Sequence, residues 1–226
     1  MSKLNISNKK PQSIVLKQES VINTIQDTQN AAVLVFCSAQ NPGGGILRGS
    51  VAQEEEIAMH SSWYFQVKDL DIFYKKNKDK HDALNSDDLI FVDKGYLLKN
   101  SFGFDCALPV SFIGSTAINL NGLINQHKTI NTDKIIKIMS QRIENILKLA
   151  EIKNNKSLIL GAFGCGVFGL DSKIISEIFY HKLNQGFFSG DIIFAIPDFD
   201  HFSVFSKTFN SFFIEPNDFN HQHEIR

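Results

Sequence analysis

Three consecutive carboxyl groups, Glu54, Glu55 and Glu56, stand shortly after a glycine-rich segment, in the first turn of an expected helix. Acids in a first turn interact favourably with the helix dipole, by about 0.3–1 kcal/mol each, which is one sufficient reason for their presence. Three successive helical residues nevertheless span about 200° of the helix circumference, so at least one side chain should point towards the protein interior. A buried carboxyl group has a raised pKa and can serve as a general acid. The triplet is therefore a candidate acid–base site, in which Glu56 is expected to be the exposed member.

The segment before the acids contains three successive glycines, Gly43, Gly44 and Gly45. It follows an apolar run at residues 31–37, a pattern typical of a strand that is buried on both faces. Successive glycines let the backbone approach a ligand where any Cβ atom would clash. The sequence thus places a candidate ligand-binding loop between a buried strand and an acid-bearing helix.

A second glycine-dense loop follows a buried strand expected at residues 157–160 and precedes a helix expected at residues 171–183. Backbone N–H groups in such a loop can cradle a phosphate group. The loop lacks the Lys and the Ser or Thr of a P-loop, and it does not fit the Rossmann fingerprint, so an ATPase or dinucleotide site is not indicated. Cys165 in this loop is a possible nucleophile, but no histidine is close to it in sequence, and a small residue packed within the loop is the preferred interpretation.

Apolar runs alternate with amphipathic segments along the whole chain. The patterns predict strands at residues 13–17, 31–37, 89–92, 105–113, 157–160 and 191–197, and helices at residues 20–28, 50–67, 132–152, 171–183 and 201–213. Ser50 and Gln53 are expected to form a capping box at the start of the second helix. This alternation predicts an α/β fold with a parallel or mixed sheet, whose ligands bind beyond the carboxyl ends of the strands.

Residues 68–93 carry a lysine-rich centre at residues 75–80 and are interpreted as an excursion over the surface. Nearby acids roughly cancel the lysines, which favours a solvated loop over a nucleic-acid patch. The whole chain has a net charge of −1, from 23 Lys and Arg against 24 Asp and Glu. This balance argues against a protein that coats a polyanion.

The 226-residue length suits a loose lead-in at residues 1–12 and one domain over residues 13–226. No run approaches the roughly 18 apolar residues of a membrane span, so no membrane partner is expected. Three cysteines, Cys37, Cys106 and Cys165, form no C-x-x-C pair, which favours a reducing compartment and a cytoplasmic location. The histidines have no metal-binding spacing, so neither a metal nor another cofactor is predicted.

The two loops together resemble a known family. Gly43-Gly44-Gly45, followed after seven residues by Gln53-Glu54-Glu55, resembles the signature of poly(ADP-ribose) glycohydrolases. The addition of Gly161-Ala-Phe-Gly-Cys-Gly-Val-Phe-Gly169 is similar to the bacterial branch of that family, whose catalytic part is a macrodomain. The resemblance extends from about residue 14 to residue 213.

The resemblance implies a three-layer α/β/α macrodomain with a mixed central sheet. It implies hydrolysis of the ribose–ribose O-glycosidic bond of poly(ADP-ribose), with ADP-ribose as the product. Glu55 would protonate the leaving 2′-hydroxyl and then activate water, while Glu54 would orient the ribose. The first loop would hold the distal ribose and the second loop the diphosphate, with Phe168 as a wall for the distal ribose. The implied substrate-binding residues are Gly43, Gly44, Gly45, Gln53, Asn119, Gly164, Cys165, Gly166, Val167, Phe168 and Gly169.

Two alternatives keep this fold. One is a mono-ADP-ribosyl hydrolase that acts on a modified protein or nucleic acid. The other is a non-catalytic ADP-ribose-binding module, against which the Gln-Glu-Glu triplet argues, because binding alone needs no buried acid. The expected partners are poly(ADP-ribose) or an ADP-ribosylated protein as substrate, and the expected state is a monomer.

Overall fold

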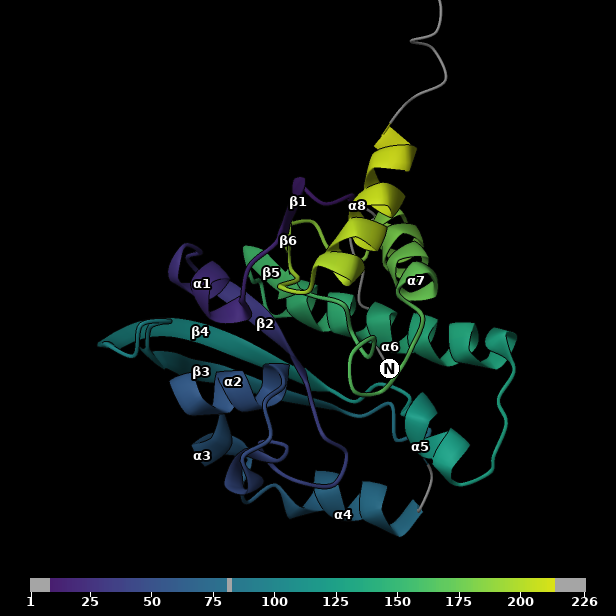
Figure 1. The fold of residues 1–226 in the computed structure, drawn as a ribbon. Helices are drawn as coiled ribbons and strands as arrows, with labels where there is room; N and C mark the ends of the chain where they lie inside the picture. The colour runs from purple at the N-terminus through teal and green to yellow at the C-terminus, as the bar shows by residue number, and fades with distance from the viewer. Residues whose placement is uncertain (1–8, 81–82, 214–226) are drawn as a thin grey trace, which may run out of the picture.

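The computed structural model describes residues 9–80 and 83–213, and its centre is a six-stranded sheet (Figure 1). The spatial order of the strands is β1-β6-β5-β2-β4-β3. All neighbouring strands run parallel except β3, which is antiparallel to β4, so the expected mixed sheet is confirmed. The strands are β1 (Ser13–Lys17), β2 (Ala31–Phe36), β3 (Leu89–Lys99), β4 (Asp105–Ser115), β5 (Ser157–Leu160) and β6 (Asp191–Ala195).

Helices cover both faces of this sheet, which confirms the predicted three layers. One face packs against α1 (Val21–Gln26), α2 (Gln53–His60), α3 (Trp63–Val67) and α4 (Asp71–Lys80). The other packs against α5 (Leu120–Asn125), α6 (Thr132–Ile152), α7 (Ser172–Asn184) and α8 (Phe199–Phe213). None of these helices, within the residues described, is long and apolar enough to cross a membrane.

Strand β2 explains how one apolar run serves two cores. Successive side chains of a strand point to opposite faces, so every second residue faces the same layer. Ala32 and Leu34 belong to the core beneath α6 and α7, whereas Ala31, Val33 and Val35 belong to the core beneath α1 and α2. A strand buried on both faces therefore reads as a continuous apolar segment, as the sequence predicted.

The helix predicted at residues 50–67 is wrong in two respects. It begins at Gln53 after an extended N-cap residue, Ala52, with no side-chain cap, so Ser50 and Gln53 form no capping box. It is also divided at Ser61, whose backbone is extended and bridges to Leu97. The Ser61 hydroxyl donates to the Ile57 carbonyl and accepts from the Trp63 N–H, so the break is stabilised by local hydrogen bonds.

The surface excursion predicted at residues 68–93 also needs correction. Its lysine-rich centre lies in α4, which buries Phe73, Tyr74 and Asn77 against the sheet. The sequence did not reveal the helical spacing of these buried residues, because lysines occupy the exposed face of the same short helix. The short helix α5 was not predicted either; Asn119 caps its start by accepting from the Gly122 N–H.

Arg142 ties α6 to the loop that precedes β3. Its guanidinium is 1% exposed and donates to the Asp87 carboxylate and to the carbonyl groups of Thr116, Leu84 and Asn85. A buried guanidinium with so many acceptors fixes the position of all the segments that supply them. The loop at residues 83–87 is thus held against the carboxyl end of β4.

Arg142→Ala is expected to lower the free energy of unfolding by at least about 2 kcal/mol, because it removes the four hydrogen bonds that the buried side chain donates. Arg48→Ala is the matched control, since Arg48 is exposed and its loss should cost less than about 0.5 kcal/mol. Urea denaturation of both variants measures the difference. Equal losses in the two variants would contradict the structural role of Arg142.

Candidate active site

The two glycine-rich loops meet because of the sheet topology. Strands β2 and β5 are parallel neighbours, so the loops at their carboxyl ends, residues 37–52 and 161–171, emerge at the same edge. Parallel α/β sheets bind their ligands at this edge. We call these segments the first loop and the second loop.

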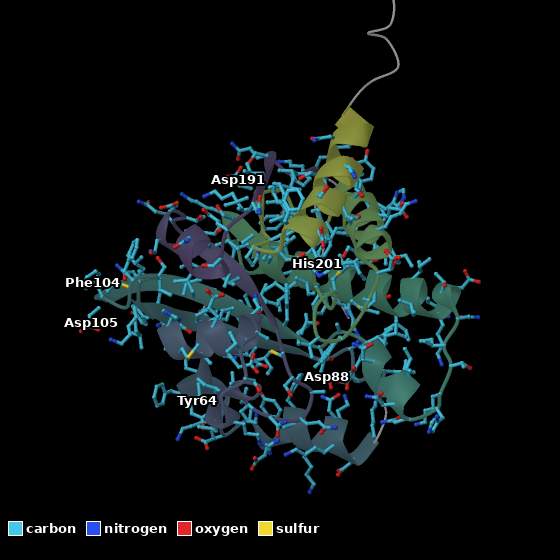
Figure 2. All side chains as sticks on the ribbon, in the orientation of Figure 1. Tyr64, Asp88, Phe104, Asp105, Asp191 and His201 are labelled. Atoms are coloured by element: carbon cyan, nitrogen blue, oxygen red, sulfur yellow. The ribbon has the colours of Figure 1, made fainter. Side chains whose placement is uncertain are left out.

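The first loop brings its backbone against the acids of α2. Gly43 and Gly44 have φ values of 67° and 66°, a left-handed conformation that glycine adopts without strain. A Cβ atom at Gly44 would lie 2.3 Å from Glu55 Oε1, and one at Gly43 would lie 2.8 Å from Tyr64 Cδ2. Tyr64, labelled in Figure 2, is therefore the side chain on which Gly43 rests. Both the conformation and the close packing require glycine at these positions.

Glu54 and Glu55 are both buried, with 3% and 6% of their surface exposed. The Gly45 N–H donates to Glu55 Oε1 at 2.6 Å, and the Ser38 N–H donates to Glu54 Oε2 at 2.6 Å. The indole N–H of Trp63 donates to Glu54 Oε1 at 3.3 Å. The prediction that at least one acid points inwards is confirmed, since both Glu54 and Glu55 do so.

Burial raises the pKa of Glu54 from its ordinary value of 4.5 to about 8. The N–H groups of Ser38 and Trp63 offset part of this effect, and the neighbouring charge of Glu55 adds to it. The third acid, Glu56, is half-buried rather than exposed as expected, because it lies beside Ser20 of the segment before α1. Burial also raises the pKa of Glu56.

Gln53 fastens α2 to the sheet. Its amide oxygen accepts from the Phe36 N–H at 2.9 Å and its amide nitrogen donates to the Leu34 carbonyl at 2.7 Å. The pairing of β2 with β5 ends at Val33, so the Gln53 amide takes the place that a neighbouring strand would fill. This contact places the two following acids at the carboxyl end of β2.

The second loop folds on itself through the Leu170 N–H, which donates to the Gly164 carbonyl at 3.0 Å. Asn121 of α5 holds the loop from outside: its backbone N–H donates to the Phe168 carbonyl and its amide to the Val167 carbonyl. Within the described chain, the N–H groups of Gly166, Val167 and Phe168 donate to no backbone or side-chain acceptor. Three consecutive free N–H groups form a suitable cradle for an anion.

Cys165 lies within this loop but is 5% exposed, and burial raises the pKa of its thiol to about 12. A thiol of this kind is a poor nucleophile near neutral pH, so the preferred interpretation of a packed small residue is supported. Gly164 and Gly169 have φ values of 80° and 75°, which glycine accommodates. Both glycines therefore shape the loop.

A cavity of about 250 Å³ lies between the first loop, the second loop and the start of α5. Ser38 belongs to its lining and is also the residue whose N–H binds Glu54. Every lining side chain is neutral, and most carry an amide or a hydroxyl group. The lining residues are Ser38, Ala39, Gln40, Asn41, Ala83, Asn85, Asn119, Gly122, Gln126 and Phe168.

Asn119 and Phe168 are the predicted substrate-binding residues that line this cavity. The sequence missed Asn85 and Gln126, which belong to segments that were not expected near the site. Two lone amides in polar segments carry no spacing signal that could have identified them. Among the residues described, no group of three or more His, Cys, Asp or Glu could hold a metal ion, while His81, His221 and His223 lie outside the described residues.

Comparisons with known proteins agree with this geometry. The family model of the microbial-type PARG catalytic domain, where PARG denotes poly(ADP-ribose) glycohydrolase, matches residues 3–100, which include the first loop and both buried acids. The structure is similar to poly(ADP-ribose) glycohydrolase from Thermomonospora curvata bound to the inhibitor ADP-HPD. That pair shares 28% identity over 86% of this chain and 78% of the other, with a TM-score of 0.80.

A second similar structure is the poly(ADP-ribose) glycohydrolase from Deinococcus radiodurans in complex with ADP-ribose. It shares 26% identity over 91% of this chain and 88% of the other, with a TM-score of 0.83. The resemblance to bacterial-type poly(ADP-ribose) glycohydrolases is confirmed. A comparison with curated proteins finds no match. The macrodomain-like fold of these glycohydrolases is thus the fold of this chain.

The raised pKa of Glu54 predicts a specific pH dependence of stability in this glycohydrolase-like site. Between about pH 4.5 and pH 8 the folded protein retains a proton that the unfolded chain has released. The stability that this group contributes is therefore greatest below pH 4.5 and is lost as the pH rises to about 8. Glu54→Gln cannot titrate and should lack this loss.

The measurement is the free energy of unfolding of wild type and Glu54→Gln at several values from pH 4.5 to pH 8. Subtraction of the two curves cancels the other titrating groups and any constant effect of the amide. The wild type should lose stability relative to the variant by up to about 1.4 kcal/mol per pH unit. Parallel curves would mean that Glu54 has no raised pKa.

Proposed function

We propose that this chain is a poly(ADP-ribose) glycohydrolase that hydrolyses the ribose–ribose O-glycosidic bond and releases ADP-ribose. The observation that carries the proposal is the pair of buried carboxyl groups at the start of α2, held by the backbone of a glycine-rich loop. An ADP-ribose-binding module has no need of such a pair, because the burial of a carboxyl group is costly without a chemical use. The likeness to solved glycohydrolases with ADP-ribose or an inhibitor bound supports the same activity.

In this proposal Glu55 is the general acid and then the general base. The Gly45 N–H fixes its Oε1, which leaves Oε2 to protonate the leaving 2′-oxygen as positive charge develops at the distal ribose. The resulting carboxylate accepts a proton from the attacking water. Glu54 orients the distal ribose by hydrogen bonds to the hydroxyl groups of the sugar.

The chemistry differs from that of glycosidases with two carboxyl groups on opposite faces of the sugar. Glu54 and Glu55 are adjacent at one helix start, so they cannot straddle a ring. We propose that the diphosphate of the substrate supplies the second electrostatic partner of the developing cation. The free N–H groups of Gly166, Val167 and Phe168 would hold that diphosphate, with the Phe168 ring beside the distal ribose.

Asn119 and the neutral amides of the adjoining cavity suit sugar hydroxyls better than phosphates, because they offer both donors and acceptors without charge. Gly43, Gly44 and Gly45 would approach the distal ribose through their backbone. Gln53 would act on the substrate through the position that it gives to Glu54 and Glu55. Gly164, Cys165 and Gly169 would shape the loop around the diphosphate.

We further propose one catalytic domain over residues 13–226 that acts as a monomer in the cytoplasm. The described part of this range contributes to a single sheet with its two helical layers. The three cysteines are free, which supports a reducing compartment. Residues 214–226 lie outside the described residues.

Incubation with poly(ADP-ribose) and, separately, with a mono-ADP-ribosylated protein tests the activity and its substrate range. Free ADP-ribose is measured from each. Release from the polymer supports the proposal, and release from the modified protein alone would replace it with a mono-ADP-ribosyl hydrolase. Binding of ADP-ribose without release from either substrate would reduce the chain to a binding module.

Glu55→Gln is expected to lower the rate of ADP-ribose release by about 10²–10⁴-fold while the affinity for ADP-ribose stays close to that of wild type. Glutamine can still accept from the Gly45 N–H, but it cannot donate an acidic proton. Glu56→Gln is the matched control on the neighbouring position and should retain activity. A loss of less than tenfold in Glu55→Gln would refute its assignment as the general acid.

Gly166→Val is expected to weaken ADP-ribose binding by at least about tenfold without loss of stability. A Cβ atom at Gly166 meets no atom within 4 Å, so the new side chain disturbs only the ligand space. Gly44→Val is the contrasting variant and should lose both stability and binding, because its φ is positive and its Cβ would strike Glu55. Calorimetric binding and thermal melting distinguish the two, and an unchanged affinity in Gly166→Val would remove the second loop from the site.

A further inference from the structure

The tip of the first loop, residues 46–51, is an exposed segment that the proposed chemistry has not used. Leu47 and Val51 are 81% and 86% exposed, and Arg48 between them is exposed as well. Single apolar residues are common on a protein surface. Two of them beside an arginine, however, offer a ligand both apolar contact and positive charge. We call residues 46–51 the loop tip.

Backbone hydrogen bonds close the loop tip on Gly45. The N–H groups of Arg48 and Ser50 both donate to the Gly45 carbonyl, at 2.8 Å and 3.2 Å, and Gly49 ends the turn with a φ of 75°. Ile46 packs against the core beneath α1 and α2. The loop tip is therefore ordered before a ligand binds, which lowers the entropic cost of binding.

Gly45 also connects the loop tip to the acid of the proposed reaction. Its N–H donates to Glu55 Oε1 at 2.6 Å, while its carbonyl closes the turn. A Cβ atom at Gly45 would lie 3.5 Å from Glu55 Oε1 and 2.2 Å from Ser50 Oγ, so the acid and the loop tip pack against the same residue. The loop tip thus begins beside the carboxyl group that would protonate the leaving oxygen.

The Arg48 guanidinium is available to a ligand. Among the residues that the structure describes, its exposed side chain forms neither a hydrogen bond nor an ion pair. Glu54 and Glu55, which follow it closely in the chain, accept from backbone N–H groups. A guanidinium without an acidic partner can donate two parallel hydrogen bonds to a phosphate group.

The leaving unit of poly(ADP-ribose) has the chemistry that suits this segment. In the proposed reaction, the leaving 2′-oxygen belongs to an adenosine that carries its own diphosphate. The glycines of the first loop and the second loop are assigned to the distal unit, so the leaving unit must extend from Glu55 over another part of the surface. Its base offers apolar faces and its diphosphate is anionic. A mono-ADP-ribosylated protein has neither group at this position.

We propose that the loop tip is a subsite for the leaving unit of poly(ADP-ribose), in which Arg48 binds a phosphate group and Leu47 and Val51 contact the adenosine. The inference rests on the proposed function, because it takes Glu55 as the acid beside the leaving oxygen. It makes Arg48 a specificity residue that favours the polymer over a mono-ADP-ribosylated protein.

Arg48→Gln tests the phosphate contact by calorimetric binding in a Glu55→Gln background, which prevents turnover. The ligands are ADP-ribose and the two-unit oligomer of ADP-ribose. Arg48→Gln should weaken binding of the oligomer by about three- to tenfold and leave binding of ADP-ribose unchanged, because only the oligomer has a leaving unit. The loss should be smaller at high salt, because salt screens exposed charges.

Lys137→Gln is the matched control for charge, because Lys137 is exposed on α6, which covers the other face of the sheet. It should bind both ligands as the parent protein does.

The apolar contact is tested separately by the double variant Leu47→Ser/Val51→Ser. It should show a selective loss of about three- to tenfold for the oligomer, because apolar surface is no longer buried against the adenosine. Ile72→Ser is the matched control, since Ile72 is 88% exposed on α4. Thermal melting should find all these variants as stable as the parent, because the replaced side chains are exposed.

Activity provides a second readout in protein with an intact Glu55. Arg48→Gln should raise KM for poly(ADP-ribose) by about three- to tenfold with little change in kcat. Any release of ADP-ribose from a mono-ADP-ribosylated protein should be unaffected.

The outcomes separate this inference from the proposed function. Unchanged binding of the oligomer in Arg48→Gln overturns the subsite, and so does an equal loss for ADP-ribose or an equal loss in Lys137→Gln. A selective loss in a protein whose wild type releases no ADP-ribose would support a subsite for a second ADP-ribose unit and refute the glycohydrolase function.

Discussion

The burial of two adjacent carboxyl groups is the constraint on which the rest of this site depends. A carboxylate removed from water is costly unless hydrogen-bond donors replace its hydration. Ser38 and Gly45 supply backbone N–H groups to Glu54 and Glu55, and Trp63 adds its indole N–H. The backbone can come this close only because Gly44 has no side chain. The glycines of the first loop and the acids of α2 are therefore one physical unit.

That unit depends in turn on the sheet. Beyond the point where β2 stops pairing with β5, the Gln53 amide makes two hydrogen bonds to the backbone of β2. These bonds fix the start of α2 in place of a side-chain cap. The next two residues are then obliged to meet the first loop. Gln53, which the sequence alone assigned to substrate binding, thus connects the helix to the sheet. Its position determines where the two acids lie.

The sequence predicted the sheet-and-helix alternation well, because β2 is a short continuous apolar run and the long helix α6 has a clear helical period. It failed where tertiary contacts override local pattern. The break at Ser61 depends on a backbone bridge to Leu97. In α4, lysines between the buried positions mask the helical pattern in the sequence. The glycines and acids of the candidate site could be singled out in the sequence, because close backbone approach restricts residue type. Asn85 and Gln126 were not, because their place beside the site comes from neighbours that are distant in the chain.

The contacts of Asn121 affect how the site can change during evolution. Helix α5 holds the second loop through two hydrogen bonds from this one residue. A Cβ atom at Gly169 would lie 2.7 Å from the Asn121 side chain, so loop and helix are fitted to each other. Sequence drift in α5, a six-residue helix, can therefore alter the shape of the second loop while every loop residue stays the same. Two homologues with identical glycine loops need not share the same loop shape, and the difference would be inherited through a helix end that a comparison of loop motifs ignores.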